Sequence, residues 1–284
     1  MTIDQKFRDS AVEAYNEKSE SKCKDFADLQ LKLKKCTDAL CKDQYFGQIR
    51  IGKSTATFCE WITPPVYLHS KKKNEKEKEK NDLQKKRNEN AEKISSCIQN
   101  ERLNTIVIVL ESPHTDEFLK IEDEWNAIGP ACGDTGENLY KWLPEVLLNY
   151  VPCIIDRGNN FRAEHSVDKE IEKTCYAIRL VNAIPYQCSL GVHTAKYRDD
   201  LFNKLWKNKL VKEEFVKRLK TSQPSIIINC CTKGYKIKEE KDELRYLVQK
   251  EINAYNKIAN CLLLRAAHPS SYHFKNGLSL VDED

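Results

Sequence analysis

Four short apolar runs mark the second part of the chain. Runs of this length without polar alternation are typical of strands buried on both faces of a parallel sheet. Segments with the helical spacing of apolar residues lie between them, so the pattern predicts an α/β fold, a three-layer sandwich around a four-stranded parallel sheet. The runs are TIVIVLE (105–111), AIRLVNA (177–183), SIIINCC (225–231) and CLLLRAA (261–267), and the helical segments lie within residues 139–147, 201–219 and 244–258.

The first hundred residues follow a different pattern and are rich in Lys, Glu, Asp and Asn. Apolar residues spaced among charges predict one or two amphipathic helices within residues 5–42. Residues 45–61 alternate polar and apolar positions as a β-hairpin does, and Thr63-Pro64-Pro65 end it. The chain is therefore expected to divide into a mainly helical N-terminal extension with a hairpin (1–100) and an α/β domain (101–284).

The net charge of the 284-residue chain is +4. That excess is local, because residues 71–93 contain 10 Lys or Arg and 6 Asp or Glu, and the remainder is formally neutral. The segment has almost no apolar residue, which predicts a solvated helix, a coil or a flexible insertion, with phosphate contact as the alternative. Net charge alone therefore gives little argument for a nucleic-acid partner.

Cysteine usage and apolar run length restrict the class of protein. The 12 cysteines include no C-x2-C pair, so reduced, mostly buried thiols are expected rather than a disulfide framework or a metal site. No apolar run approaches the roughly 20 residues that cross a bilayer. The first residues also lack the apolar core of a secretory signal. We expect a cytoplasmic protein with no cofactor and no membrane partner.

Polar residues follow each apolar run, at the point where the expected strand ends. The carboxyl ends of parallel strands meet at one edge of a sheet, where open α/β sheets bind their ligands. These side chains are therefore expected to converge. The segments are Glu111-Ser112-Pro113-His114, then Asn182, then Thr232-Lys233-Gly234, and finally residues 268–273 (HPSSYH).

These segments resemble the motifs of the uracil-DNA glycosylase superfamily, in the same order along the chain. ESPH (111–114) is similar to the family's first motif and HPSS (268–271) to its His-Pro-Ser motif. Between them, RLVNAIP (179–185) has the asparagine that ends an apolar strand in the family, and IIINCC is like its third strand. The resemblance covers about residues 104–277. It implies an enzyme that flips a base out of DNA and hydrolyses its N-glycosidic bond.

The resemblance also implies roles for individual side chains. Breaking an N-glycosidic bond builds positive charge on the sugar and negative charge on the departing base. Glu111 is the candidate that stabilises the sugar cation and positions or deprotonates water, and His268 is the candidate donor to the base oxygen. Asn182 would read the Watson–Crick edge through its amide. The alternative acids are Asp116, Glu117 and Asp134.

Departures from the family pattern predict a wider pocket. Uracil-specific members have Gly-Gln-Asp-Pro-Tyr-His, and Ser112 and His114 stand here at the positions of its aspartate and tyrosine. The loop within residues 129–143 has Cys132 and small neighbours where those members place an aromatic ring against the base. The loss of both rings predicts a substrate larger than uracil, such as a 5-substituted or glucosylated cytosine, in DNA repair or in defence against phage DNA.

DNA contacts are expected from the residues that follow His268. Ser270 and Ser271 would lie near phosphates, and Tyr272 stands where the family commonly places a leucine wedge that fills the vacated base stack. Lys233 and Lys275 are expected as further phosphate contacts.

Two rival functions stay open. Residues 47–54 (GQIRIGKS) match the P-loop pattern G-x4-G-K-[ST]. A P-loop follows a buried strand and opens a helix, whereas the flanking residues here favour a hairpin with its turn at Gly52-Lys53. The other alternative is a catalytically inactive relative that binds DNA or a protein, because Ser112 replaces the motif's aspartate.

Overall fold

The structure is a computed structural model. It describes residues 41, 43–53, 56–67, 73–101, 104–121, 124–155, 173–188, 195–234 and 239–281. Apart from Cys41, the segment 5–42, for which amphipathic helices are predicted, lies outside the described residues.

A seven-stranded mixed sheet forms the centre of the described fold, with the strand order β2-β1-β6-β3-β7-β8-β9. Strands β6, β3, β7 and β8 are neighbours and run parallel to one another. They correspond to the four apolar runs, but the sheet does not stop there as predicted, because antiparallel strands extend it at both edges. The strands are β1 (Gln44–Lys53), β2 (Thr57–Thr63), β3 (Asn104–Leu110), β6 (Lys173–Asn182), β7 (Ile226–Asn229), β8 (Leu262–Arg265) and β9 (Ser279–Leu280).

The hairpin predicted within residues 45–61 is part of this sheet. Strand β1 pairs antiparallel with β2 on one side and with β6 on the other, so Ile49 faces both Trp61 and Tyr176. Gly52 and Lys53 are paired residues of β1 rather than a turn, which corrects the predicted turn position. The P-loop-like segment is therefore mostly an antiparallel strand that leads into another strand, and the strand-to-helix context of a P-loop is not present in its described residues.

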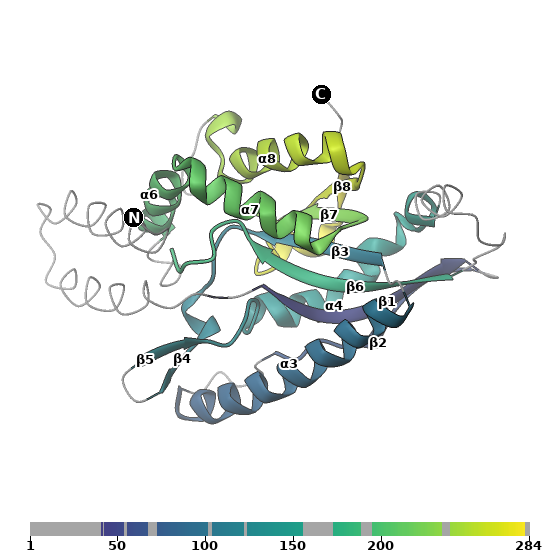
Figure 1. The fold of residues 1–284 in the computed structure, drawn as a ribbon, viewed down its shortest axis with the longest axis horizontal. Helices are drawn as coiled ribbons and strands as arrows, with labels where there is room; N and C mark the ends of the chain where they lie inside the picture. The colour runs from purple at the N-terminus through teal and green to yellow at the C-terminus, as the bar shows by residue number, and fades with distance from the viewer. Residues whose placement is uncertain are drawn as a thin grey trace, which may run out of the picture.

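Helices cover both faces of the sheet and complete three layers (Figure 1). Helix α4 packs on one face, while α6, α7 and α8 pack on the other. None of the described helices combines the length and the apolar character needed to cross a membrane. The helices are α3 (Lys73–Glu101), α4 (Asp134–Leu148), α6 (Ala195–Trp206), α7 (Lys209–Ser222) and α8 (Leu244–Ala259).

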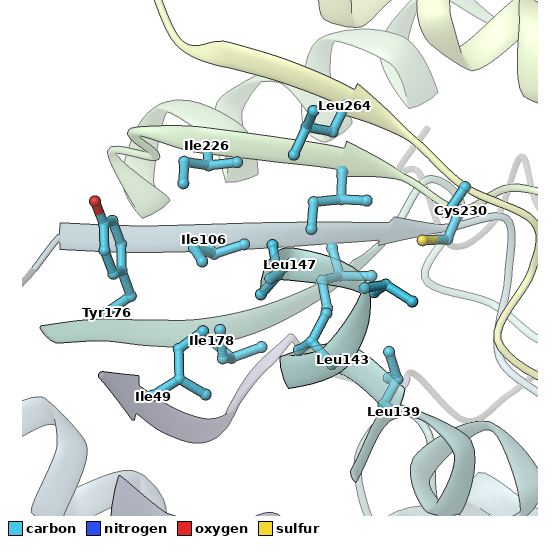
Figure 2. Packing of buried hydrophobic residues seen from close by; sticks show 14 of the residues in the cluster. Ile49, Ile106, Leu139, Leu143, Leu147, Tyr176, Ile178, Ile226, Cys230 and Leu264 are labelled. Carbon is cyan, nitrogen blue, oxygen red and sulfur yellow. The ribbon is translucent and has the colours of Figure 1, made fainter. Parts of the chain in front are cut away.

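Strand β3 shows why its apolar run lacks alternation. Its side chains point in turn to two different cores: Ile106 and Ile108 pack toward α4, whereas Val107 and Val109 pack toward α7 and α8. Figure 2 shows the α4 side, where Leu143 and other apolar residues of this helix cover the strands. Each fully buried aliphatic side chain contributes about 1.5–3 kcal/mol relative to exposure. Both faces of β3 therefore hold the layers together.

The charged segment 71–93 lies largely within helix α3, of which only the outer face is solvated. Lys80, Leu83, Arg87 and Ile94 recur at helical spacing and are buried. Lys80 donates a hydrogen bond to the carbonyl of Phe118 at 2.7 Å, so its ammonium is satisfied inside the fold. Strands β4 (Phe118–Ile121) and β5 (Glu124–Ala127) form a short two-stranded sheet. Leu83 packs against this sheet and against the loop that follows β5. Of the predicted alternatives, the solvated helix agrees with the structure except on one face, where Lys80, Leu83 and Arg87 are buried.

Candidate active site

A cavity of about 410 Å³ lies at the carboxyl ends of the parallel strands. The chain after β3 leads to α4 on one face of the sheet, whereas the chain after β7 leads to α8 on the other face. Ligand crevices form at such a switch point because adjacent loops diverge there. The lining comes from the segments that follow β3, β7 and β8, from the start of α4 and from Arg198 of α6: residues 110–114, 116, 117, 133–135, 198, 232, 268, 270 and 271.

Glu111 is hydrogen-bonded to residues that follow two of the neighbouring strands. It follows β3 directly and is 6% exposed. Its backbone carbonyl accepts a hydrogen bond from the amide of Ile184, beyond β6, at 3.0 Å. Its carboxylate oxygen Oε2 accepts another from the amide of Thr232, beyond β7, at 3.3 Å. These bonds fix the carboxylate in the cavity wall.

His268 faces Glu111 from the end of β8. Its Nε2 atom lies 3.5 Å from Oε2 of Glu111. Its Nδ1 atom accepts a hydrogen bond from the amide of Ser270 at 3.2 Å and lies 2.8 Å from the Ser270 hydroxyl. Since Nδ1 accepts from a backbone N–H, the neutral ring carries its proton on Nε2. The imidazole therefore presents an N–H group on the side of Glu111.

Arg198, on the first turns of α6, completes this group and was not foreseen from the sequence. A guanidinium nitrogen lies 3.8 Å from Oε1 of Glu111, and two others lie 2.7 Å from Oδ1 of Asp199. The positive charge of Arg198 thus lies between two carboxylates in a site where its side chain is 15% exposed. Arg198 belongs to no recognisable sequence motif. Its place beside Glu111 therefore follows only from the fold.

Glu117 organises the cavity wall rather than facing His268. Its carboxylate accepts hydrogen bonds from the amides of Ala131 at 2.6 Å and His114 at 3.0 Å. Burial raises the pKa of Glu117 to about 8, although both amides and the charge of Arg87 act to lower it. This carboxyl group therefore ties the first motif to the loop before α4.

Arg87 of α3 holds the same loop from the other side. Its guanidinium donates to the carbonyls of Pro130 at 2.6 Å, Ala131 at 2.9 Å and Val66 at 2.9 Å. Ala131 has a φ of 57°, a left-handed conformation that is uncommon for a residue with a side chain. The buried guanidinium thus donates to the carbonyls that precede and follow the strained Ala131 backbone, those of Pro130 and Ala131. A residue of the N-terminal hundred thus braces the loop that leads to the cavity.

All four candidate acids line the cavity, but their surroundings differ. Glu111 alone contacts His268, and Glu117 is bound to two amides. Asp116 lies 3.6 Å from Nδ1 of His114. Asp134 begins α4 and is exposed. The geometry therefore favours Glu111 as the acid that acts together with His268.

The predicted substrate-binding residues separate into two groups. Ser112 and His114 line the cavity as expected. Cys132 does not: its thiol is buried and donates to the carbonyl of Gly129 at 3.1 Å, and burial raises its pKa to about 12. Asn182 ends β6 but is 1% exposed and is not part of the cavity lining. Neither polar atom of its side-chain amide has a hydrogen-bond partner among the described residues.

The predicted DNA contacts also occupy different places. Ser270 and Ser271 line the cavity, and Tyr272 beside them is 74% exposed. Asn138 of α4 donates to the carbonyl of Pro269 at 2.8 Å and so fixes this segment on the helix. Lys233 is outside the lining and forms a 3.5 Å ion pair with Glu243.

The described residues show no group of three or more His, Cys, Asp or Glu side chains placed to hold a metal ion. Each of the ten cysteines among them is a free thiol. No family model matches the chain, and neither a curated protein nor a solved structure matches it. The chemistry of the site is therefore argued from its own residues.

Proposed function

We propose that the protein is a DNA glycosylase of the cytoplasm that hydrolyses the N-glycosidic bond of a flipped-out base and leaves an abasic site. The observation that carries this proposal is the placement of Glu111 and His268, 3.5 Å apart, in a cavity at the ends of two parallel strands. The resemblance of ESPH, RLVNAIP and HPSS to the uracil-DNA glycosylase motifs supports it independently.

Each of the two side chains would stabilise one of the two charges that develop in the reaction. The Nε2–H of His268 would donate to the base oxygen on which negative charge develops. The carboxylate of Glu111 would stabilise the positive sugar and position the attacking water. Both groups line the same cavity, so a single bound nucleotide can contact both. Their separate backbone partners hold each group in place before the substrate arrives.

The charge of the cavity suits an uncharged base better than a phosphate. Four carboxyl groups line it, and Arg198 is the only Arg or Lys among the described lining residues. A neutral base avoids repulsion by the carboxylates of Glu111, Asp116 and Asp134, and a sugar that becomes cationic gains from them, whereas burial keeps the Glu117 carboxyl group largely protonated at neutral pH. Phosphates would accordingly remain outside the cavity.

The cavity also supports a substrate larger than uracil. Its volume of about 410 Å³ lies within the range of roughly 300–1,000 Å³ that holds drug-sized ligands. None of the described lining residues is Phe, Tyr or Trp. We propose a 5-substituted cytosine, with or without an attached sugar, as occurs in modified phage DNA. The biological role would then be repair or defence against such DNA.

Excision assays on a panel of bases test this function. The purified protein is incubated with single-stranded and duplex DNA that carries uracil, hydroxymethylcytosine or glucosylated hydroxymethylcytosine, and alkali-labile sites are counted. We expect abasic sites with at least one modified cytosine and slower excision of uracil. Excision of uracil as fast as every bulky base would contradict the substrate assignment, and no abasic site on any DNA would contradict the enzyme.

A catalytically inactive module that binds DNA or a protein is the second candidate. The observation that favours it is Asn182, whose amide is buried outside the cavity lining and so does not present its polar atoms to a base there. Tight DNA binding with no abasic sites on the whole panel would identify this function. The comparison is made under the same salt conditions, because DNA affinity depends strongly on salt.

A further inference from the structure

Two lysines and two aromatic rings alternate on the surface next to the cavity. The 3-10 helix η4 (Tyr272–Asn276) follows Ser271, which lines the cavity, and it packs on α4. Lys275 of η4 lies between the rings of Tyr272 of η4 and Trp142 of α4, and Lys141 of α4 contacts the Trp142 ring. We call these four residues the η4–α4 platform.

The platform is ordered by contacts between ammonium groups and rings. The Nζ atom of Lys275 lies 3.7 Å from the ring centroid of Tyr272 and 6.0 Å from the centroid of Trp142. Lys141 Nζ lies 4.7 Å from the Trp142 centroid. Tyr272 is nevertheless 74% exposed, so its ring is accessible to a ligand from solvent.

We propose that this platform binds the single-stranded DNA that flanks the base held in the cavity. The proposal rests on the proposed function for the identity of the strand. The exposed ring of Tyr272 and the accessible part of the half-buried Trp142 ring provide sequence-tolerant stacking for bases, and the lysines beside them contact phosphates. Asp116 and Asp134 at the cavity repel phosphates, so the strand has an electrostatic reason to pass over the platform while only its uncharged base enters the cavity.

A second cluster of lysines provides the alternative site. A surface hollow of about 610 Å³ along α7 is lined by five lysines, among them Lys217 and Lys220. One of its lysines, Lys212, lies 5.9 Å from the centroid of the Trp206 ring, but this ring is only 3% exposed and so is not available for stacking. Glu213 and Glu251 also line the hollow and pair with Lys209 and Lys212, at 3.3 Å and 3.0 Å. The hollow therefore has a positive surface without a base platform, and Lys217 and Lys220 serve as the matched control.

The first test measures phosphate contact. Fluorescence anisotropy of a labelled oligothymidylate without any modified base gives the affinity for the full-length protein at several salt concentrations. Each phosphate contact with a single strand contributes about 0.7 to the slope of log K against log salt concentration. We expect the Lys141→Ala/Lys275→Ala variant to lower the slope by about 1.4, whereas Lys217→Ala/Lys220→Ala leaves it unchanged. The reverse result would overturn the platform.

The second test measures stacking. The Tyr272→Ala variant is expected to bind the same oligonucleotide roughly tenfold more weakly, a loss of about 1.4 kcal/mol, because it removes the ring on which a base stacks. Tyr272→Phe keeps the ring and should keep the affinity. Bound DNA should quench tryptophan fluorescence in the wild type and much less in Trp142→Phe. An equal loss in the Ala and Phe variants of Tyr272, or unchanged quenching, would contradict stacking. Tighter binding of the matching duplex would contradict the preference for a single strand.

The outcomes for the platform and for the glycosylase can be separated. The oligonucleotide contains no excisable modified base, so its binding does not depend on catalysis. Loss of binding in the platform variants, with no excision by the wild type, supports the platform and counts against the enzyme. Excision by the wild type, with full DNA binding by the platform variants, supports the enzyme and overturns the platform.

Discussion

The Nε2 atom of His268 lies 3.5 Å from Oε2 of Glu111, although the two residues follow the first and the last strand of the parallel core. Residues that follow the other two parallel strands, β6 and β7, also form hydrogen bonds with Glu111. Ile184 lies beyond β6 and Thr232 beyond β7, and their amides bind the carbonyl and the side chain of Glu111. Glu111 is thus the point at which all four parallel strands are connected beyond their carboxyl ends.

The contact predicts how the two residues share catalysis. His268→Ala and Glu111→Gln should each lower the rate of base excision at least about 100-fold, the usual effect of removing a charge-stabilising donor or an acid–base group. DNA affinity should change little, because neither residue belongs to the η4–α4 platform. Single-turnover excision and anisotropy are measured on the same modified oligonucleotide. A variant that keeps its full excision rate would remove that residue from the mechanism.

The brace by Arg87 predicts a role of α3 in stability. Arg87→Ala should lower the free energy of unfolding by about 3 kcal/mol or more, because it leaves the carbonyls of Pro130, Ala131 and Val66 without their buried donor. Urea unfolding followed by circular dichroism measures the loss. Lys86→Ala, at the exposed neighbouring position of α3, is the matched control and should change stability by less than about 0.5 kcal/mol. Equal effects of the two variants would show that the brace contributes nothing.

The pKa of Glu117 predicts a pH dependence of stability. Burial raises this pKa from 4.5 to about 8, so the folded protein retains a proton that the unfolded chain has lost within that interval. The free energy of unfolding therefore falls as pH rises through this window, by up to about 1.4 kcal/mol per pH unit from this group.

Glu117→Gln stays neutral at every pH and should reduce the fall in stability. The measurement is urea unfolding at about pH 5 and about pH 8, the two ends of the interval over which the proton is lost. Glu92→Gln changes an exposed carboxylate of α3 and should behave like the wild type. If Glu117→Gln retains the wild-type dependence on pH, the carboxyl group does not titrate in this range.

Packing at Gly47 separates the hairpin from the P-loop interpretation. A Cβ atom at Gly47 would lie 2.8 Å from the carbonyl oxygen of Thr63 and 2.8 Å from the Trp61 ring. Gly47→Ala should therefore destabilise the fold by about 1–3 kcal/mol, as overpacking usually does. The measurement is thermal or urea unfolding. Binding of ATP by the wild type that is lost in Lys53→Ala would instead support a nucleotide site.

The strands and helices of the core were largely predictable from the chain because their signals are local. The apolar run at 105–111 corresponds to β3, and the helical spacing around Leu139 and Leu143 corresponds to α4. The alternation at 45–61 predicted a hairpin correctly, but it could not show that β1 pairs with β6. The residues of one strand do not specify its partner, because the pattern of a strand reports which of its faces are buried and not which neighbouring strand its backbone pairs with.

The candidate site was predictable only where residues follow strand ends. Ser112, His114, Ser270 and Ser271 line the cavity as their positions implied. Cys132 and Asn182 were assigned to substrate by resemblance, yet both side chains are buried away from the cavity lining. A position in a motif fixes the place of the backbone. The direction and partners of a side chain depend on neighbours distant in the chain.

The sequence by itself determined the parallel core and which polar residues stand at its carboxyl edge, because hydrophobic periodicity and chain order are local properties. Only the tertiary structure placed Arg198 beside Glu111, joined Arg87 of a highly charged helix to the loop at 130–131, and brought Lys275 beside the Trp142 ring. Each of these contacts joins segments that are distant in sequence. The free energy of these contacts arises from burial and from charges that come together only in the folded protein. A short stretch of sequence therefore does not predict them.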